Sequence, residues 1–226
     1  MKYLVIVPAY NESQVIFRTL TNLKQTLKKS PKFDIVVVDD GSIDSTYKEA
    51  KKAKVTVLQH KLNRGLGGAL STGLEYAKRN HYNLAITFDA DGQHDPKDII
   101  RAIRPIEKNQ ADVVIGTRTR GKGHMPIDRS ILNWSSNIFT WVLFGVWTTD
   151  SQSGFRAFSK NALQLIQIKT QQMEVSSEFF AEIKRNHLRL IEVPIKVIYT
   201  KYSRAKGQTN MNALNVFVKL LLRLAR

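Results

Sequence analysis

Two carboxylates stand one residue apart in this sequence, at Asp89 and Asp91, directly after the apolar run 84–88. In an extended segment, residues i and i+2 point to the same side of the chain, so both carboxylates can face one point. Carboxylates held together repel each other, and one is pushed toward protonation unless a cation lies between them. A hard divalent ion removes that repulsion when it binds the carboxylates together with phosphate oxygens of a substrate. A solvated Asp-Gly turn, with Gly92 as its glycine, is the alternative interpretation.

The composition is that of a globular protein, with 226 residues and 42% hydrophobic residues, enough for one domain with a sizeable core. The absence of cysteine excludes disulfides and thiolate metal sites and fits a reducing compartment. The apolar run at residues 3–8 is too short for a signal peptide, and no stretch reaches the roughly 18–20 apolar residues of a spanning helix. We therefore expect a cytoplasmic protein.

The net charge of +16 predicts a polyanionic partner, such as nucleic acid, an anionic membrane surface or a phosphorylated substrate. Nucleic acid fits poorly, because no recognised nucleic-acid-binding module is present and the acidic loops described below would repel a phosphate backbone.

Short apolar runs alternate with helical patterns along the first half of the chain. The runs that read as buried strands are residues 3–7, 33–38, 55–58, 84–88 and 111–116, and helical patterns begin near Glu12, Ser45, Gly65 and Pro96. This alternation predicts βαβ units and an α/β fold with a mostly parallel sheet. Later helices are expected near residues 161–166 and 177–184, and a strand pair interrupted by Pro194 at residues 190–199.

Ligands of open parallel sheets bind beyond the carboxyl ends of the strands. Polar residues gather at three such ends, in segments 9–12, 39–42 and 89–91. Because the fold would bring these three acidic loops to one rim, we favour a ligand site over a solvated turn at Asp89.

Three motifs carry a family resemblance, and they occur in order at residues 7–12 (Val-Pro-Ala-Tyr-Asn-Glu), 38–42 (Val-Asp-Asp-Gly-Ser) and 89–93 (Asp-Ala-Asp-Gly-Gln). Together they resemble the family 2 glycosyltransferases, which have the GT-A fold. The chain is most similar to the polyprenyl-phosphate (dolichyl-phosphate) mannosyl- and glucosyltransferases. The resemblance implies one domain over residues 1–210, with a nucleotide-sugar-binding half (1–116) and an acceptor half (117–210).

The resemblance also assigns roles to individual residues. Asp89, Asp91 and Gln93 would hold Mg2+ or Mn2+ against the donor diphosphate, where the ion stabilises the leaving group. Asp91 would thereby take part in catalysis. The implied donor-binding residues are Pro8, Tyr10, Glu12, Asp39, Asp40, Asn63, Arg64, Asp89, Ala90, Asp91 and Arg204. The glycine-rich stretch 65–68 lacks the position of a dinucleotide fingerprint, so we interpret it as close helix packing.

On the acceptor side, the resemblance implies that Arg118 and Arg129 grip an acceptor phosphate and that Asn133 adds a hydrogen bond. Asp150 belongs to a family segment, Asp-x-x-Ser-Gly-Phe, and would lie near the acceptor. A hydroxyl acceptor needs a base, worth about 10²–10⁴-fold in rate, whereas a phosphate is already anionic. Asp150 would act as a base in the first case and position the acceptor in the second; capping of the 151–154 turn is the alternative.

Residues 131–147 carry no charge and contain Trp134, Trp141 and Trp147, with polar residues recurring at spacings of three and four. A buried core helix is one interpretation. The other, which the resemblance favours, is an amphipathic interfacial helix or helix pair with its tryptophans at headgroup depth.

The end of the chain is basic. Residues 202–210 resemble a family loop that closes over the donor diphosphate, with Arg204 matching, although Thr209 and Asn210 replace the family's Ser and Lys. Residues 211–226 predict an amphipathic helix that suits an anionic membrane surface, the domain itself or a second copy in a homo-oligomer.

The sequence thus predicts an inverting, metal-dependent glycosyltransferase at the inner face of the cell membrane. It would move glucose or mannose from UDP or GDP to a polyprenyl phosphate, with a lean to UDP-glucose. A hydroxyl acceptor, such as a glycan or glycolipid, is the alternative within the class. A basic, non-catalytic nucleotide- or nucleic-acid-binding protein is a remote alternative.

Overall fold

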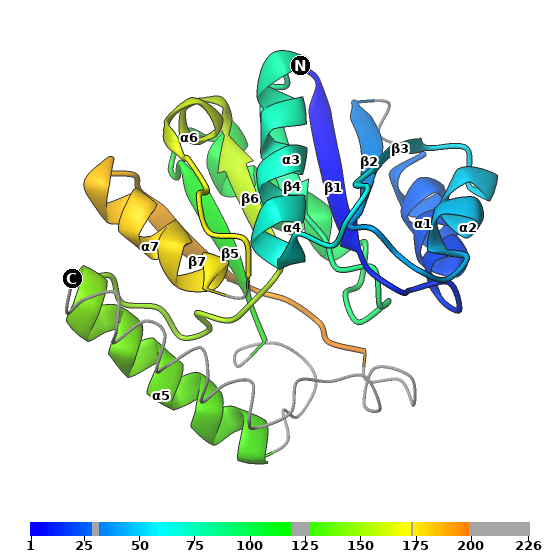
Figure 1. Ribbon diagram of the computed structural model, residues 1–226. Helices are drawn as coiled ribbons and strands as arrows, with labels where there is room; N and C mark the ends of the chain where they lie inside the picture. The colour runs from blue at the N-terminus through cyan, green and yellow to red at the C-terminus, as the bar shows by residue number, and fades with distance from the viewer. Residues whose placement is uncertain (29–31, 119–126, 173, 199–226) are drawn as a thin grey trace.

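A computed structural model describes residues 1–28, 32–118, 127–172 and 174–198, and for 127–132 the backbone alone (Figure 1). The predicted donor-loop residue Arg204 and the predicted helix 211–226 therefore lie outside the described residues. The elements in chain order are β1 Tyr3–Ala9, α1 Ile16–Leu27, β2 Phe33–Asp39, α2 Thr46–Lys52, β3 Thr56–Gln59, α3 Gly65–Arg79, β4 Leu84–Thr87, α4 Asp98–Glu107, β5 Val113–Thr117, α5 Ile127–Phe144, β6 Arg156–Ser159, α6 Lys160–Leu165, α7 Val175–Arg185 and β7 Leu190–Pro194.

The described strands form one seven-stranded sheet in the order β3-β2-β1-β4-β6-β5-β7. All neighbouring pairs are parallel except those of β6, which runs antiparallel to both β4 and β5. The predicted α/β fold with a mostly parallel sheet is confirmed.

Helices cover both faces of the sheet, and the alternation along β1 explains why its whole sequence is apolar (Figure 1). Tyr3, Val5 and Val7 pack on one face with α1, α2 and α4, whereas Leu4 and Ile6 pack on the other with α3, α6 and α7. Since parallel strands in such a sheet are buried on both sides, their sequences read as continuous apolar runs.

Two sequence predictions differ from the structure. The antiparallel strand β6 was not predicted, because its four residues include a charged one, Arg156. The predicted strand pair at 190–199 is wrong in its second half among the described residues. After β7 ends at Pro194, Val197 makes an isolated bridge to His94. Pairing ends there because the neighbouring strand β5 ends at Thr117, whose carbonyl accepts a last hydrogen bond from the Ile195 amide (3.0 Å).

Helix α5 projects from the body of the sheet (Figure 1). Its polar residues Asn133, Asn137 and Thr140 are buried, while 62% of Trp134 and 52% of Trp141 are exposed. This orientation rules out the buried-core interpretation of the uncharged stretch, and the stretch forms one helix rather than a pair. Among the described helices, none combines the length and apolar character needed to cross a membrane.

Candidate active site

The carboxyl ends of β1, β2 and β4 meet at one rim of the sheet, because Ala9 lies opposite Asp39 and Ile6 opposite Thr87. Asp39 there is fully buried and accepts hydrogen bonds from the Ser42 amide (3.2 Å) and from Gln59 Nε2 (3.0 Å). The predicted donor-side carboxylate is therefore held in place by its own loop and by the neighbouring strand β3.

Asp40 joins this loop to the start of α3. Its Oδ1 accepts from the Arg64 amide (2.9 Å) and from His60 Nδ1 (2.7 Å). Gly41 has φ +71°, and a Cβ on it would lie 2.7 Å from the Asn63 amide. The structure thus brings Asp40, Asn63 and Arg64 together, as the predicted donor site requires.

The first motif, residues 7–12, lies against the second, residues 38–42. The Asn11 amide donates to Ser42 Oγ (3.0 Å), and the Glu12 amide donates to Thr46 Oγ1 (2.7 Å) at the start of α2. Pro8 is partly buried and Tyr10 is 41% exposed on the same rim.

The glycine-rich start of α3 packs against the segment that precedes α7. A Cβ on Gly67 would collide with the Thr170 carbonyl, and the Gly68 amide donates to the Gln171 carbonyl (3.2 Å). The close backbone approach predicted for this stretch is confirmed.

Asp89 is fixed by a histidine and a glycine. His94 Nε2 donates to Asp89 Oδ2 (2.9 Å), and the imidazole ring packs edge-on against Phe88 and Phe155. A Cβ on Gly154 would collide with both carboxylate oxygens of Asp89, so only glycine leaves room there. Burial raises the pKa of Asp89, but His94, Arg118 and Arg156 outweigh it and hold the pKa below its ordinary value.

Asp91 lies in the same loop, but its pKa is shifted in the opposite direction. Burial and the charge of Asp89 raise the pKa of Asp91 to about 6. Its two oxygens accept from the amide (2.9 Å) and from Nε2 (2.6 Å) of Gln93. The carboxylates of Asp89 and Asp91 thus flank Ala90, which is buried. The Ala90 carbonyl accepts a hydrogen bond from Thr19 Oγ1 (3.0 Å).

This donor set fits a divalent ion that shares its ligands with a substrate. Two mutually repelling carboxylates and an amide side chain are oxygen ligands of the kind that Mg2+ and Mn2+ take. In the described part of the chain, no group of three His, Cys, Asp or Glu side chains could hold a metal by itself. Phosphate oxygens would have to complete the coordination.

Arg118 and Asp150 form a bidentate ion pair across the rim. Arg118 Nε (2.8 Å) and Nη2 (2.6 Å) donate to the two oxygens of Asp150, and the Arg118 amide donates to Oδ2 as well (2.8 Å). The side chain of Asp150 is 0% exposed, whereas that of Arg118 is 23% exposed. Arg118 is therefore the member of the pair that a ligand can reach.

The inward face of α5 holds the turn that carries Asp150. Asn133 Nδ2 (3.1 Å) and Asn137 Nδ2 (2.8 Å) both donate to the Thr149 carbonyl, and Asn137 Oδ1 accepts from the Ser151 amide (2.8 Å). Glu192 on β7 accepts from Thr148 Oγ1 (2.7 Å) on the other side of the turn. The side chain of Arg129 lies outside the described residues.

Arg156 is a buried cation behind both halves of the site. Its guanidinium lies 4.5 Å from the ring centre of Phe179, and its Nη2 donates to the Ser151 carbonyl (3.0 Å). Burial lowers the pKa of Arg156 to about 10, and the charges of Asp150 and Asp89 oppose that shift. The residue stays a cation at neutral pH.

The rim thus combines acidic donor-side loops, a carboxylate pair suited to a divalent ion and an arginine on the opposite side. The sequence matches the family described as Glycosyl transferase family 2 over residues 4–166. The chain is a family 2 glycosyltransferase.

Two curated relatives of this transferase have stated activities. It is 39% identical to the UDP-N-acetylglucosamine–dolichyl-phosphate N-acetylglucosaminyltransferase of Methanococcus voltae, over 96% of this chain and 94% of the relative. It is 30% identical to the undecaprenyl-phosphate mannosyltransferase of Micrococcus luteus, over 91% and 87% of the two chains.

Among solved structures, the transferase is similar to glucosyl-3-phosphoglycerate synthase from Mycobacterium tuberculosis, crystallised with Mn2+, UDP and phosphoglyceric acid. The TM-score is 0.73 at 17% sequence identity, and the match covers 98% of this chain and 78% of the synthase. This likeness confirms the predicted GT-A fold.

Sequence reasoning missed three residues of this transferase that shape the site: His94, Arg156 and Glu192. His94 directly follows the acidic motif, and Arg156 directly follows the Ser-Gly-Phe segment, so their positions were a usable signal. The sequence contained no such signal for Glu192, because its partners Thr148 and Thr149 are more than 40 residues away along the chain.

Proposed function

We propose that this glycosyltransferase moves a sugar from a nucleotide sugar to the phosphate of a polyprenyl phosphate. Relatives of 39% and 30% identity have names that specify dolichyl-phosphate and undecaprenyl-phosphate acceptors. The choice of a phosphate acceptor over a hydroxyl acceptor rests on the burial and hydrogen bonding of Asp150. This carboxylate is fully buried and accepts three hydrogen bonds from Arg118.

A carboxylate in such a pair is poorly placed to act as a general base, because both of its oxygens already accept hydrogen bonds from Arg118 and its side chain is fully buried. A hydroxyl acceptor needs a base, and a phosphate acceptor does not. In this proposal Asp150 is a positioning residue that orients Arg118, and Arg118 binds the acceptor phosphate. Arg129 and Asn133 remain predicted acceptor contacts.

In the proposed reaction, an acceptor phosphate oxygen forms a bond to the anomeric carbon of the sugar. The bond from that carbon to the donor diphosphate breaks, and its electron pair leaves with the nucleoside diphosphate, so the anomeric configuration inverts. Asp89, Asp91 and Gln93 would hold a divalent ion, Mg2+ or Mn2+, which when bound supplies positive charge against the departing diphosphate. Pro8, Tyr10, Glu12, Asp39 and Asp40 would enclose the nucleoside.

The proposal places the protein at a membrane surface, where polyprenyl phosphates reside. Trp134, Trp141 and Trp147 are each more than half exposed, and tryptophan favours the membrane–water interface. The net charge of +16 favours an anionic leaflet. The inner face of the cell membrane, a homo-oligomer and the lack of nucleic-acid binding stay predictions.

A donor screen tests the function. UDP-N-acetylglucosamine, UDP-glucose and GDP-mannose are each incubated with a short-chain polyprenyl phosphate and with the corresponding polyprenol, and products are identified by mass. Transfer to the phosphate but not to the alcohol is expected; transfer to the alcohol alone would refute the phosphate assignment.

The variant Asp150→Asn sharpens this test. With a phosphate acceptor it should raise the KM for the acceptor and leave residual transfer, because Arg118 loses its anchor but no base is lost. Near-complete loss of kcat with an unchanged KM would instead identify Asp150 as a base. The matched control is Asp112→Asn, since Asp112 accepts from the amide and Nε of Arg189 in the same way, next to the amino ends of β5 and β7.

A further inference from the structure

Arg156, on β6, is a buried cation that the reaction proposed above does not use. Only 3% of the residue is exposed, so a substrate cannot contact it. Burying a charged group is costly unless hydrogen bonds and opposite charges compensate it. The groups that compensate Arg156 therefore indicate what it does.

The direct contacts of Arg156 satisfy it only in part. Its Nη2 donates to the Ser151 carbonyl (3.0 Å), and its guanidinium carbon lies 4.5 Å from the ring centre of Phe179 and 5.8 Å from that of Phe180. Its Nε is buried and has no hydrogen-bond partner in the described part of the chain. Because a carbonyl and two rings carry no net negative charge, the opposite charge comes from carboxylates farther away.

Two carboxylates of the site supply this charge, one on each side of the rim. The first is Asp150, which directly precedes the residue whose carbonyl Arg156 binds. The second is Asp89, whose carboxylate lies against Gly154, two residues before Arg156. The charges of both carboxylates oppose the lowering of the pKa of Arg156 by burial, and Arg156 in turn helps to lower the pKa of Asp89. Arg156 therefore acts on the acceptor side and on the metal loop at once.

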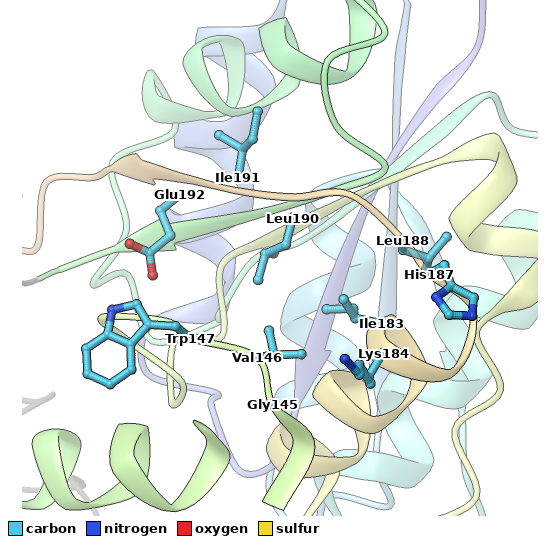
Figure 2. A pocket seen from close by; sticks show the side chains of 10 residues that line it. All are labelled: Gly145, Val146, Trp147, Ile183, Lys184, His187, Leu188, Leu190, Ile191 and Glu192. Carbon is cyan, nitrogen blue, oxygen red and sulfur yellow. The ribbon is translucent and has the colours of Figure 1, made fainter. Parts of the chain in front are cut away.

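The turn at residues 148–151 has anchors besides Arg156. Glu192, whose carboxylate points toward Trp147 in Figure 2, accepts from the hydroxyls of both threonines in this turn (2.7 and 2.9 Å). Asn137 Oδ1 accepts from the last amide of the turn (2.8 Å). Since these bonds hold the backbone of the turn, the distinct contribution of Arg156 is its positive charge.

That charge matters when a phosphate binds Arg118, because two anions then share one arginine. Asp150 accepts three hydrogen bonds from Arg118, and its side chain is 0% exposed. A phosphate and an uncompensated carboxylate on the same arginine would repel each other. With Arg156 compensating Asp150 from the interior, the charge of Arg118 acts on the phosphate.

We propose that Arg156 is a positioning residue for both substrates, whose buried charge compensates Asp150 behind the acceptor site and Asp89 at the metal site. The proposal rests on the proposed function, which supplies the acceptor phosphate and the donor-bound metal ion. It adds a residue that links the two sides of the rim without contacting either substrate.

Two substitutions of similar length separate charge from packing. Arg156→Lys keeps the positive charge, and Arg156→Met removes it. For Arg156→Met we expect the KM for a C10 polyprenyl phosphate to rise about 30-fold and Mn2+ affinity in the presence of UDP to fall about tenfold, with kcat changed less than about fivefold. Arg156→Lys should stay within about threefold of wild type in both quantities, because the compensating charge remains. Initial rates and isothermal titration measure them.

Phe158→Leu is the control, since Phe158 lies two residues along β6 and stacks on Phe179 with ring centres 5.3 Å apart. It should lower the melting temperature but leave acceptor KM and Mn2+ affinity unchanged. Equal losses in the Lys and Met variants, or losses in Phe158→Leu that match those of Arg156→Met, would show packing rather than charge. Unchanged values in Arg156→Met, or a loss confined to one of the two sites, would also overturn the proposal.

A test without substrate keeps this proposal separate from the proposed function. If wild-type protein transfers no sugar to a polyprenyl phosphate, the function fails, and the melting temperatures of Arg156→Met, Asp150→Asn and the double variant still decide the role of Arg156. The double variant should melt no lower than Arg156→Met, because Asp150→Asn removes a buried carboxylate that has lost its compensation. Additive lowering would refute the pairing of charges.

Asp112→Asn is the matched second substitution in this test, because Asp112 pairs with Arg189 instead. Combined with Arg156→Met, it should lower the melting temperature further. If Arg156→Met does not fold, folding of the double variant with Asp150→Asn supports the proposal, and failure of that double variant to fold contradicts it.

Discussion

The donor and acceptor sides of the rim are held together in different ways. On the donor side, Asp39 and Asp40 are fixed by groups within 24 residues of them, and the strands β1 and β2 beneath are parallel and mostly buried. On the acceptor side, Arg118 meets Asp150 across 32 residues, and Thr87 meets Gly154 across 67. The Asp39–Asp40 loop is therefore held by groups nearby in the sequence, whereas the Arg118–Asp150 pair and the Thr87–Gly154 contact join segments that are farther apart.

The two sides are joined at β6, the antiparallel strand that lies between β4 and β5. Thr87 Oγ1 donates to the Gly154 carbonyl (2.6 Å), and the Arg156 amide donates to Thr87 Oγ1 (3.1 Å). Gly154 in turn lies against the Asp89 carboxylate. The metal-binding prediction and the acceptor prediction thus concern one connected structure.

The largest expected effect falls on the donor side. Asp91→Asn removes one of the two carboxylates, so we expect a loss of about 10²–10³-fold in kcat/KM and of nucleotide-dependent metal binding. Isothermal titration with Mn2+ and UDP measures the binding. Asp95→Asn, in the same loop, is the control, and equal losses in both variants would show a loop effect rather than a metal site.

The next largest effect is expected at the contact between Gly154 and Asp89, where the donor and acceptor sides of the rim meet. Gly154→Ala places a methyl group against Asp89, which must shift, and we expect metal affinity to fall about 10–100-fold, as for other residues that orient ligands. Acceptor KM should rise as well, because the same turn leads to Asp150. An effect on the metal without any effect on the acceptor would show that the two sides are independent.

The pKa of Asp91, raised to about 6, makes metal binding depend on pH. A proton and a metal ion compete for this carboxylate, so Mn2+ affinity should fall about tenfold between pH 7 and pH 5, with proton uptake from solution on release. The folding stability of the metal-free protein should depend on pH in the opposite sense. Because the folded pKa lies above the ordinary value of 3.8, this group adds stability as the pH falls through 6. Asp91→Asn should abolish the pH dependence of both the Mn2+ affinity and the folding stability. If either pH dependence persisted in that variant, it would belong to another group.

The smallest effect is expected within the acceptor side. Asn137→Ala leaves the buried Ser151 amide without its partner, which costs about 1–3 kcal/mol of unfolding free energy. Acceptor KM should rise about fivefold and donor KM should stay unchanged, because the turn loosens while the donor loops do not. Chemical denaturation and initial rates measure the two quantities. A larger change in donor KM than in acceptor KM would contradict the separation of the two sides.

Predictions from the sequence succeeded where the signal was local. The strands β1, β2, β4 and β5 were recognised from apolar runs, because strands buried on both faces leave a continuous pattern. The edge strand β3 was recognised as well, although its residues are exposed or only partly buried. The helix boundaries were less exact: α4 begins at Asp98, two residues after the proline that was expected in its first turn. The strand β6 was missed, since a four-residue strand that carries a buried arginine has no periodic signature.

The sequence by itself determined the family, the parallel half of the sheet and the acidic loops at its rim, because each depends on residues close together in the chain. The tertiary structure alone decided that Asp150 is committed to Arg118, that the polar face of α5 points inward and its tryptophans outward, and that Gly154 leaves space for Asp89. The physical reason is common to all three. Hydrogen bonds and steric limits between residues 12 to 67 positions apart leave no periodicity in the sequence that could reveal them.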